Sequence, residues 1–436
     1  MGHHSPGMWE RYALSPMREL WTLEAQYRRW LEVELAALAA LEGLGRVPPG
    51  TAATVQEKAR IDVARILEIE REVGHDLLAF LSAVEESVGE EGRWLHFGLT
   101  SSDVKDTALA LTIRDALDLL LEKAYALAEV LWKLAERYRE TPIIGRTHGQ
   151  YAEPTTFGLK LLVWYDWLSR VRERLARGRE AISVGKLSGA VGTHAHFPPE
   201  AEAKALEGLG LKPCPVTTQV IPRDRHAQVF WAMASTASLV EAIALEVRHL
   251  SRSEVGEVAE GRPEGSSAMP HKKNPILSER LCGLARVVQA SLGPALEDCA
   301  LWHERDMSHS SVERVLLPQC FILTDYMLTK ARELLENLRV FPERMLARLL
   351  AARGLPFSEG LLLALVGKGM SRRQAHALVA QLSTLAEEGD RELSEVAAEH
   401  PRVKELLSQT EIEAIFDLGT WLRGVGEAFR RVSPPG

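Results

Sequence analysis

The chain has 436 residues, of which 46% are hydrophobic and 26% charged, and its formal net charge is −8. This length allows two or three domains with sizeable cores, and the composition is ordinary for a soluble globular protein. The acidic balance argues against a general nucleic-acid or acidic-membrane binder, no apolar run reaches the roughly 20 residues of a membrane helix, and no secretion signal is visible. We therefore expect a cytoplasmic protein without nucleic-acid or membrane partners.

Helical patterns dominate the chain. Apolar residues recur at three- and four-residue spacing from about Leu20 onwards. Long segments, without internal proline except for Pro294, predict helices over residues 104–140, 155–184, 225–258, 276–301 and 318–338. Helices of this length suit an extended bundle, and part of their apolar surface is expected to face other copies of the chain. No alternating pattern predicts a sheet, apart from a short candidate strand near residues 215–220.

Two shifts in composition predict domain boundaries. One lies near residues 89–95, before the long helices, and the other near residues 338–342, where Pro342 interrupts the pattern. We therefore expect three helical domains: an N-terminal domain over residues 1–93, a central long-helix domain over 94–341, and a small C-terminal domain over 342–436.

The first polar groups in the chain precede expected helices. His75 is followed by Asp76, and an adjacent carboxylate can raise the pKa of a histidine and fix its tautomer; a surface helix cap would explain the pair equally well. Thr100, Ser101 and Asp103 precede the first long helix. Such residues are good N-caps, and a helix N-terminus with hydroxyl groups also binds anions, so both uses can coexist.

Two further polar segments interrupt the long helices. His148 lies within Gly145–Gln150, between Pro142 and Pro154, and histidine suits general acid or base work at neutral pH; the alternative is a polar turn with a solvent-facing imidazole. Arg305 and Arg314 present guanidinium groups that match carboxylate and phosphate oxygens. Ion pairs with neighbouring carboxylates are the alternative for each arginine.

The segment Gly265–Pro275 cannot be a helix interior, because it contains two prolines. It carries hydroxyl, imidazole and ammonium groups, which are typical of an active-site lid but also of a solvated connector. An acidic chain that concentrates such groups in the loops beside long helices predicts an anionic small-molecule substrate. The four cysteines are widely spaced and predict reduced thiols without a zinc site.

The motifs resemble a known family. Residues 265–275 match G-S-S-x-M-P-x-K-x-N-P, the signature loop of the fumarase/aspartase superfamily, at every fixed position. The variant with His271 is similar to the adenylosuccinate lyase family and to bacterial carboxymuconate cycloisomerases. The adenylosuccinate lyase family is favoured by matches that extend over nearly the whole chain, at residues 10–12, 75–76, 99–104, 145–150 and 219–224.

The resemblance implies an all-α homotetramer with a central bundle of twenty helices, sites shared between three subunits, and no metal or organic cofactor. The implied reaction is a β-elimination that releases fumarate from adenylosuccinate, giving AMP, and from the succinyl-carboxamide ribotide SAICAR, giving AICAR, in purine nucleotide synthesis. Ser266 would be the general base and His148 the general acid, with His75 as the other candidate acid. Lys272 would stabilise the doubly charged aci-carboxylate intermediate.

The resemblance also implies substrate-binding residues. The phosphate and neighbouring groups would be held by Arg11, Tyr12, Arg305, Ser310 and Arg314, with support from His75 and Asp76. The succinyl carboxylates would be held by Thr100, Ser101, Lys272 and Asn274, the polar middle of the substrate by Gln219, and Arg280 would reach the same site. Gly74 departs from the larger residue that many relatives carry. The rival functions are a cycloisomerase, another fumarate-releasing lyase, and a non-catalytic helical assembly protein.

Overall fold

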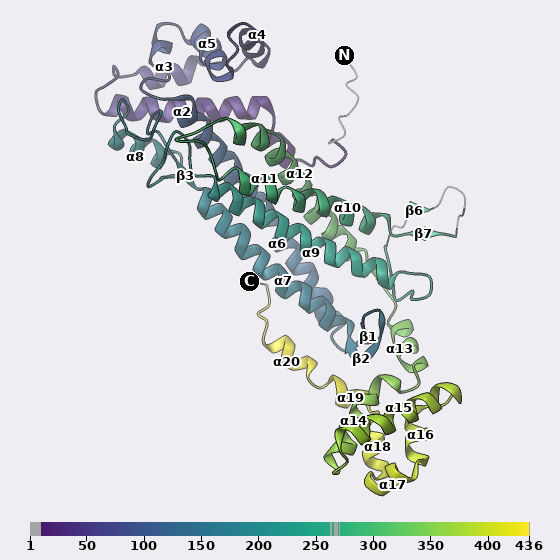
Figure 1. Cartoon of the computed structure of the whole chain (residues 1–436). Coiled ribbons are helices and arrows are strands. Elements are labelled where there is room, and N and C mark those ends of the chain that lie inside the picture. Colours follow the sequence, from purple (N-terminus) through teal and green to yellow (C-terminus); the bar gives the residue numbers. More distant parts are fainter. Residues whose placement is uncertain (1–9, 262–263, 266–268, 270, 436) are drawn as a thin grey trace. The chain divides into compact units, whose positions relative to one another are not determined.

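The computed structural model describes residues 10–261, 264–265, 269 and 271–435 (Figure 1). Ser266, the candidate base, lies outside the described residues. The described chain is mainly helical and its strands are short, which confirms the all-α prediction. Its shorter helices before residue 100 are α1 (Met17–Leu20), α2 (Leu23–Gly43), α3 (Thr51–Lys58), α4 (Val63–Val73), α5 (Asp76–Val88) and η1 (Glu90–Trp94).

The predicted long helices are present. They are α6 (Ser101–Arg137), α7 (Phe157–Ile182), α9 (Asp224–Leu250), α10 (Ile276–Ala290) and α12 (Ser308–Glu336), with the shorter α8 (Pro199–Gly208) and α11 (Leu292–Glu297) between them. The predicted helix over residues 276–301 is divided at Ser291, between α10 and α11. The C-terminal helices are α13 (Pro342–Ala351), η2 (Leu355–Phe357), α14 (Ser358–Gly367), α15 (Arg372–Glu388), α16 (Leu393–Glu399), α17 (Pro401–Leu406), α18 (Gln409–Ile415), α19 (Leu418–Leu422) and α20 (Val425–Arg430).

One predicted helix start was wrong. We placed it at Pro318, but α12 begins at Ser308 and Pro318 lies inside the helix. Proline removes one backbone hydrogen bond, here the bond to the carbonyl of Arg314, and the remaining bonds of a long helix can carry it past that point. The residues 305–314 therefore include the start of a helix.

The expectation of no sheet apart from a short strand near residues 215–220 was also wrong. Strands β1 (Pro142–Thr147) and β2 (Gln150–Thr156) form an antiparallel hairpin between α6 and α7. The candidate strand near residues 215–220 is not one: the strand in that region is β4 (Lys212–Pro213), which pairs in parallel with β3 (Val184–Gly185). The other strands are β5 (Val258–Ala259), β6 (Glu264–Gly265), β7 (Lys273–Asn274) and β8 (Arg339–Val340), paired antiparallel as β5–β8 and β6–β7.

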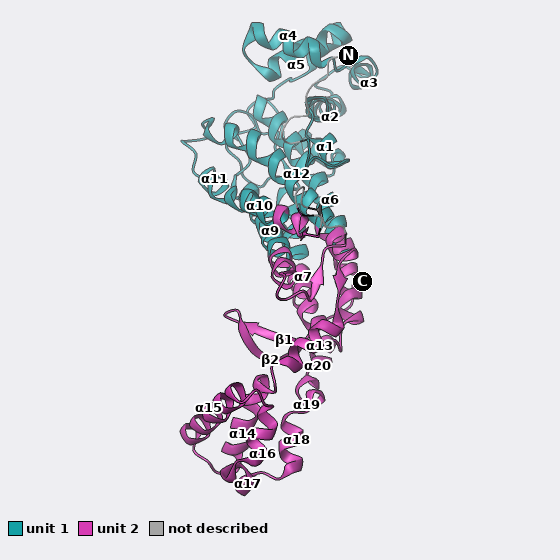
Figure 2. Ribbon diagram, turned by 90° about the vertical axis from the view of Figure 1, so that its right-hand side faces the viewer, with its two compact units in different colours: residues 1–125, 170–241, 281–330 teal, residues 126–169, 242–280, 331–436 magenta. Residues whose placement is uncertain are grey.

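The chain divides into two compact units (Figure 2). Unit 1 comprises residues 1–125, 170–241 and 281–330, and unit 2 comprises residues 126–169, 242–280 and 331–436. Each long helix contributes residues to both units. The domain boundaries expected near residues 93 and 341 stay a prediction.

Each unit has its own apolar core. In unit 1, α2, α5 and α8 pack with the start of α6, and Tyr27, Trp30 and Phe80 form an aromatic cluster with ring centroids 5.3–5.9 Å apart. In unit 2, a separate core joins α14 to α18, and Ile144 of the hairpin packs against Leu349 of α13. The hairpin is therefore fixed by burial at its base.

Two stretches of the described chain are long and apolar enough to cross a membrane: α9, and the bent pair formed by residues 342–351 and 355–367. For α9, 61% of the most apolar window is buried within the structure. Core helices of soluble proteins pass the same test, so this is weak evidence for a membrane span.

Candidate active site

The sequence-predicted site residues fall into two groups. Those in unit 1 are Arg11, Tyr12, His75, Asp76, Thr100, Ser101, Gln219, Arg305, Ser310 and Arg314. Those in unit 2 that the structure describes are His148, Lys272, Asn274 and Arg280. Most of the expected substrate-binding residues therefore belong to unit 1, and the described catalytic candidates, apart from His75, belong to unit 2.

Asp76 is the centre of a cationic cluster in unit 1. Its Oδ1 accepts a hydrogen bond from Lys105 Nζ at 2.5 Å, and Arg314 Nη2 lies 3.6 Å from its Oδ2. Burial raises the pKa of Asp76, but the hydrogen bond and charge of Lys105 outweigh burial and leave that pKa below its ordinary value. Two cations around one carboxylate leave an excess of positive charge, which suits an anionic ligand.

Sequence reasoning missed Lys105. A signal was present, since Lys105 lies four residues after Ser101 and therefore on the same face of α6. Its ammonium group also lies 5.4 Å from the ring centroid of Trp30. The contacts with Trp30 and with the Asp76 carboxylate hold the ammonium group of Lys105 beside Asp76.

His75 is the N-cap of α5. Its Nδ1 accepts a hydrogen bond from the backbone N–H of Leu78 at 3.3 Å, and its side chain is 40% exposed. The cap alternative from the sequence is therefore confirmed. An Nδ1 atom that accepts this bond has no proton, so the neutral ring carries its proton on Nε2 and can donate from there.

The start of α6 is shaped by a buried ion pair. Asp103 Oδ2 accepts from the backbone N–H of Thr100 at 2.9 Å, and Asp103 also pairs with Lys186. Both side chains of the pair are fully buried. The carboxylate thus fixes the turn on which Thr100 and Ser101 lie, so Asp103 has the capping role expected of this run; Ser101 and Asp103 lie inside α6 rather than before it.

This pair yields a stability prediction. Replacing Lys186 with methionine should lower the free energy of unfolding by about 3–5 kcal/mol, because the carboxylate of Asp103 loses its buried partner. Urea denaturation followed by circular dichroism checks the change. The control is Lys133→Met, which removes an exposed 3.8 Å pair with Glu129 and should cost under about 1 kcal/mol. Equal effects of the two substitutions would contradict the prediction.

A second polar network in unit 1 joins residues 219–223 to α6 and α12. Arg305 Nη1 donates to Gln219 Oε1 at 3.1 Å, so these two predicted site residues are in contact. Arg223, which is 3% exposed, donates to both oxygens of Asp106 at 2.7 and 3.0 Å and to Glu313 at 3.1 Å. Arg223 thereby joins α6, α12 and the segment that carries Gln219.

Burial controls the ionisation of this network. It raises the pKa of Glu313 to about 7, whereas the charge of Arg223 outweighs burial at Asp106 and lowers that pKa to about 2. Burial and the charge of Arg223 lower the pKa of His226 to about 3 and that of His309 to about 4. These two histidines are therefore neutral at pH 7. This network could not be predicted from the sequence, because Asp106, Arg223 and Glu313 are far apart along the chain.

The other candidates in unit 1 lie at its surface or on helix ends. The ring of Tyr12 meets that of Tyr326 edge-on at 5.1 Å, and Arg11 is exposed beside it in the chain. Ser310 lies in the first turn of α12.

The two arginines of residues 302–314 have partners elsewhere in the chain. Among the described interactions, Arg305 donates to Gln219 and Arg314 lies beside Asp76. The alternative that they pair with neighbouring carboxylates was therefore wrong.

His148 occupies the tip of the hairpin in unit 2. Thr147 pairs with Gln150, which leaves His148 and Gly149 as a two-residue turn with φ of 54° and 77°. Two left-handed residues in succession define the hairpin turn that matches the twist of antiparallel strands. A histidine in this conformation is uncommon, and the residue is exposed.

The described part of the signature loop is also a hairpin. Glu264 pairs with Asn274 and Gly265 with Lys273, and the N–H of Lys272 donates to the carbonyl of Met269 at 3.0 Å. The side chain of Lys272 is exposed. A short ladder therefore closes the base of the segment that contains Ser266.

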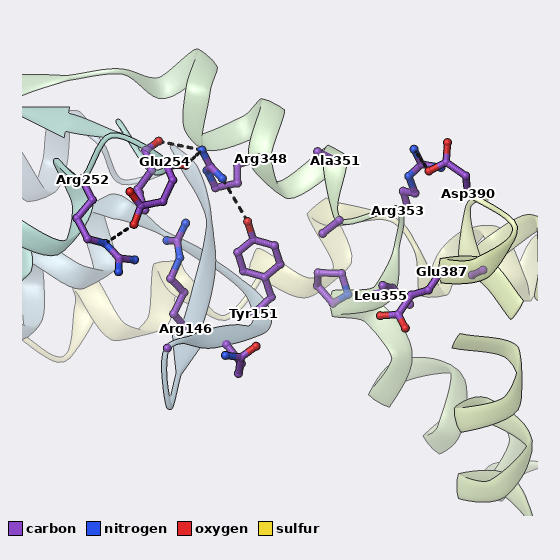
Figure 3. Close-up of a pocket in the computed structure, with 16 residues that line it drawn as sticks. Arg146, Tyr151, Arg252, Glu254, Arg348, Ala351, Arg353, Leu355, Glu387 and Asp390 are labelled. Carbon is purple, nitrogen blue, oxygen red and sulfur yellow. Dashed lines mark hydrogen bonds and ion pairs between the residues drawn. The ribbon is translucent and has the colours of Figure 1, made fainter. Parts of the chain in front are cut away.

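A cavity of 720 Å³ lies in unit 2 beside the first hairpin (Figure 3). Its four arginines are paired: Arg146 and Arg348 with Glu257, Arg252 with Glu254 at 3.3 Å, and Arg353 with Asp390. The charges of the lining are therefore nearly balanced, so it has no clear preference for an anion. Within the described residues no group of three or more histidine, cysteine, aspartate or glutamate side chains is arranged to hold a metal ion.

Comparison with known proteins identifies the family. A family model described as "Lyase" matches residues 10–290, and one described as "Adenylosuccinate lyase C-terminus" matches residues 354–432. Adenylosuccinate lyase from Thermotoga maritima is 48% identical over 97% of this chain and 99% of its own length. Adenylosuccinate lyase from Aquifex aeolicus is 47% identical over 98% of this chain and 99% of its own length.

Solved structures agree on the fold. The chain is similar to a fumarate lyase from Mesorhizobium sp. BNC1, with a TM-score of 0.89 and 29% identity over 96% of this chain and 97% of that one. It is also similar to a 3-carboxy-cis,cis-muconate lactonizing enzyme from Pseudomonas putida, with a TM-score of 0.86 and 28% identity over 96% of each chain. Since the full-length identity is much higher to the adenylosuccinate lyases, and both family models match, the chain belongs to the adenylosuccinate lyase family.

Proposed function

We propose that this chain is a carbon–nitrogen lyase that releases fumarate from adenylosuccinate, giving AMP, and from SAICAR, giving AICAR, in purine nucleotide biosynthesis. The observation that carries this proposal is the 48% identity to an adenylosuccinate lyase over 97% of the chain. The cations and polar groups collected in unit 1 support it, because both substrates are anionic. No metal or organic cofactor enters the proposed reaction.

The reaction begins with removal of a proton from the carbon next to a carboxylate. We assign this step to Ser266, in the signature loop. The resulting aci-carboxylate carries two negative charges, which must be stabilised by fixed cations and donors. Lys272 and Asn274, at the described base of the loop, are the residues we assign to that charge, and Arg280 follows in the second turn of α10.

The departing nitrogen must then gain a proton, and we assign this step to His148. Its exposed position at a hairpin tip suits proton transfer to a substrate group. The cap bond at His75 supports this choice over His75, because protonation of Nδ1 would break the bond to Leu78 N–H. We assign His75 the role of a neutral donor through Nε2.

The remaining assignments concern binding. We propose that the substrate phosphate and its neighbours are held by Arg11, Tyr12, Arg305, Ser310 and Arg314, with His75 and Asp76 in support. Thr100 and Ser101 would hold a succinyl carboxylate at the start of α6, where backbone N–H groups favour anions. Gln219, which already contacts Arg305, would meet the polar middle of the substrate.

We propose a homotetramer in which three subunits contribute to each site, and a cytoplasmic location. Exposed apolar side chains on the long helices support self-association, because covering such side chains with a partner subunit removes apolar surface from water, which is favourable. Examples are Val163 on α7, Trp231 and Leu245 on α9, and Val287 on α10, which are 41–58% exposed.

An assay of the purified protein tests the function. Adenylosuccinate should yield AMP and fumarate in equal amounts, measured by ultraviolet absorbance and by chromatography of the nucleotides, without added metal ions. SAICAR should yield AICAR under the same conditions. Turnover of a carboxymuconate or of argininosuccinate in place of both nucleotides would refute the proposal and favour a related lyase or cycloisomerase.

A further inference from the structure

Glu257 is a fully buried carboxylate in unit 2, at the end of the turn that follows α9. It accepts two hydrogen bonds from one guanidinium group: Arg146 Nη1 donates to Oε2 at 3.0 Å and Nη2 donates to Oε1 at 2.9 Å. Arg348 Nε lies 3.7 Å from Oε1. A buried carboxylate is tolerated only when paired and hydrogen-bonded in this way, and the bidentate geometry fixes orientation as well as distance.

Arg146 transmits this constraint to the hairpin tip. It lies in β1 two residues before His148, just beyond the irregularity between Ile144 and Arg146 in the strand pairing. Its guanidinium group lies 5.6 Å from the ring centroid of Tyr151, the residue opposite it in β2. The last pairs of the hairpin, which set the direction of His148, are thus attached to Glu257.

Arg348 of α13 connects the same two segments. Its Nη1 donates to Tyr151 Oη at 3.3 Å, and its Nη2 donates to the carbonyl of Val255 at 3.1 Å and to that of Glu254 (Figure 3). One arginine therefore connects the second strand of the hairpin to the segment just before Glu257.

The chain after Glu257 leads directly into the signature loop. The backbone of Glu257 is fixed by its N–H to the carbonyl of Leu250 at 2.9 Å and by its carbonyl to the N–H of Phe341 at 3.0 Å. Glu260, three residues on and 5% exposed, accepts from Ser278 N–H at 2.8 Å and from Ser278 Oγ–H at 2.6 Å. It also accepts from Leu277 N–H at 3.3 Å, so it caps α10, the helix that follows the loop.

From these contacts we propose that Glu257 is a positioning residue, which sets the orientation of the hairpin that carries His148. The inference rests on the proposed function, since that function gives His148 the acid role. A charge-assisted bidentate bond holds the hairpin in one orientation, and a shift of about 1 Å in a reacting group can cost on the order of 10²-fold in rate.

The test is Glu257→Gln, which keeps the shape of the side chain but removes its charge and one acceptor. We expect kcat for adenylosuccinate to fall about 10- to 100-fold, with KM changed by less than about 3-fold. The matched control is Glu246→Gln, which weakens the 2.8 Å pair with Lys160 in the same unit and should leave kcat within about 2-fold of wild type. Unchanged kcat in Glu257→Gln would overturn the inference.

A double-mutant cycle separates positioning from general stability. In a His148→Gln background, Glu257→Gln should cost less than about 3-fold in kcat, because the group it orients is already absent. If the full loss persists in that background, Glu257 acts only on the stability of the unit and the inference fails. If His148→Gln alone leaves kcat unchanged, the acid assignment in the proposed function is what fails.

Arg146→Lys provides a second variant in case the buried amide of Glu257→Gln prevents folding. Lysine keeps the positive charge but cannot form the bidentate bond. The same 10- to 100-fold loss of kcat, with the urea midpoint close to that of wild type, supports the positioning role. Wild-type kcat in this variant would overturn it.

Discussion

Replacing Ser266 with alanine is expected to lower kcat for adenylosuccinate by at least about 10³-fold, within the range of 10²–10⁴ that acid–base groups contribute. Alanine has no oxygen to accept the Cβ proton, and the carbanion cannot form without a base. The measurement is the initial rate at saturating adenylosuccinate. Because the substitution removes only a hydroxyl group, the assembly and the thermal midpoint should match those of wild type.

The neighbouring residue provides the control for this prediction. Ser267→Ala removes a hydroxyl group of the same kind one position along the loop and should retain kcat within about 10-fold, because a hydrogen bond to substrate is worth less than a base. Wild-type activity in Ser266→Ala would remove Ser266 from the base role. A much larger loss in Ser267→Ala than in Ser266→Ala would move that role to Ser267.

Replacing His148 with glutamine is expected to lower kcat by about 10²-fold or more. Glutamine preserves the size and polarity of the side chain at the hairpin tip but cannot transfer a proton at neutral pH. A histidine acid must be protonated to act, so wild-type kcat should fall on the alkaline side of its pH profile. The profile of His148→Gln should lose that alkaline limb, and a limb that persists at the same pH would contradict the assignment.

The same substitution at the other histidine decides between the two candidate acids. His75→Gln removes the Nδ1 cap of α5, and loss of a cap costs about 1 kcal/mol of stability. We expect its effect on kcat to be smaller than that of His148→Gln, with a larger effect on KM. The reverse order would assign the acid role to His75.

The two inactive variants also test the proposed tetramer. If Ser266 and His148 of one site come from different subunits, then tetramers reassembled from a mixture of Ser266→Ala and His148→Gln chains contain some sites with neither substitution. Activity should therefore reappear on mixing, after mild dissociation. No recovery, with mixed tetramers shown to form, would place both residues of a site on one subunit.

Local sequence patterns predicted the helices and the polar segments between them. The periodic apolar residues of α6, α7 and α9 were sufficient because helical packing repeats every three or four residues. Asp103, in the first turn of α6, was recognised among the capping residues because capping is decided within one turn. The signature loop was recognisable because its fixed residues lie within one short segment.

The same patterns failed where partners lie far apart in the chain. Pro318 suggested the start of a helix, and nothing local indicated that the bonds of α12 would continue past it. The strands of the His148 hairpin lack a clear alternation, and the base of the hairpin is fixed by packing of Ile144 against Leu349 of α13. A strand with weak local preference takes its structure from such contacts.

The sequence by itself therefore determined the helical class, the family and the chemical types of the candidate site residues, because each is encoded in short stretches of chain. Only the tertiary structure decided their partners: Lys105 beside Asp76, Arg223 between Asp106 and Glu313, and Glu257 on Arg146. The last pair joins residues 111 positions apart. Such pairs depend on how distant segments pack, which no local period of the sequence records.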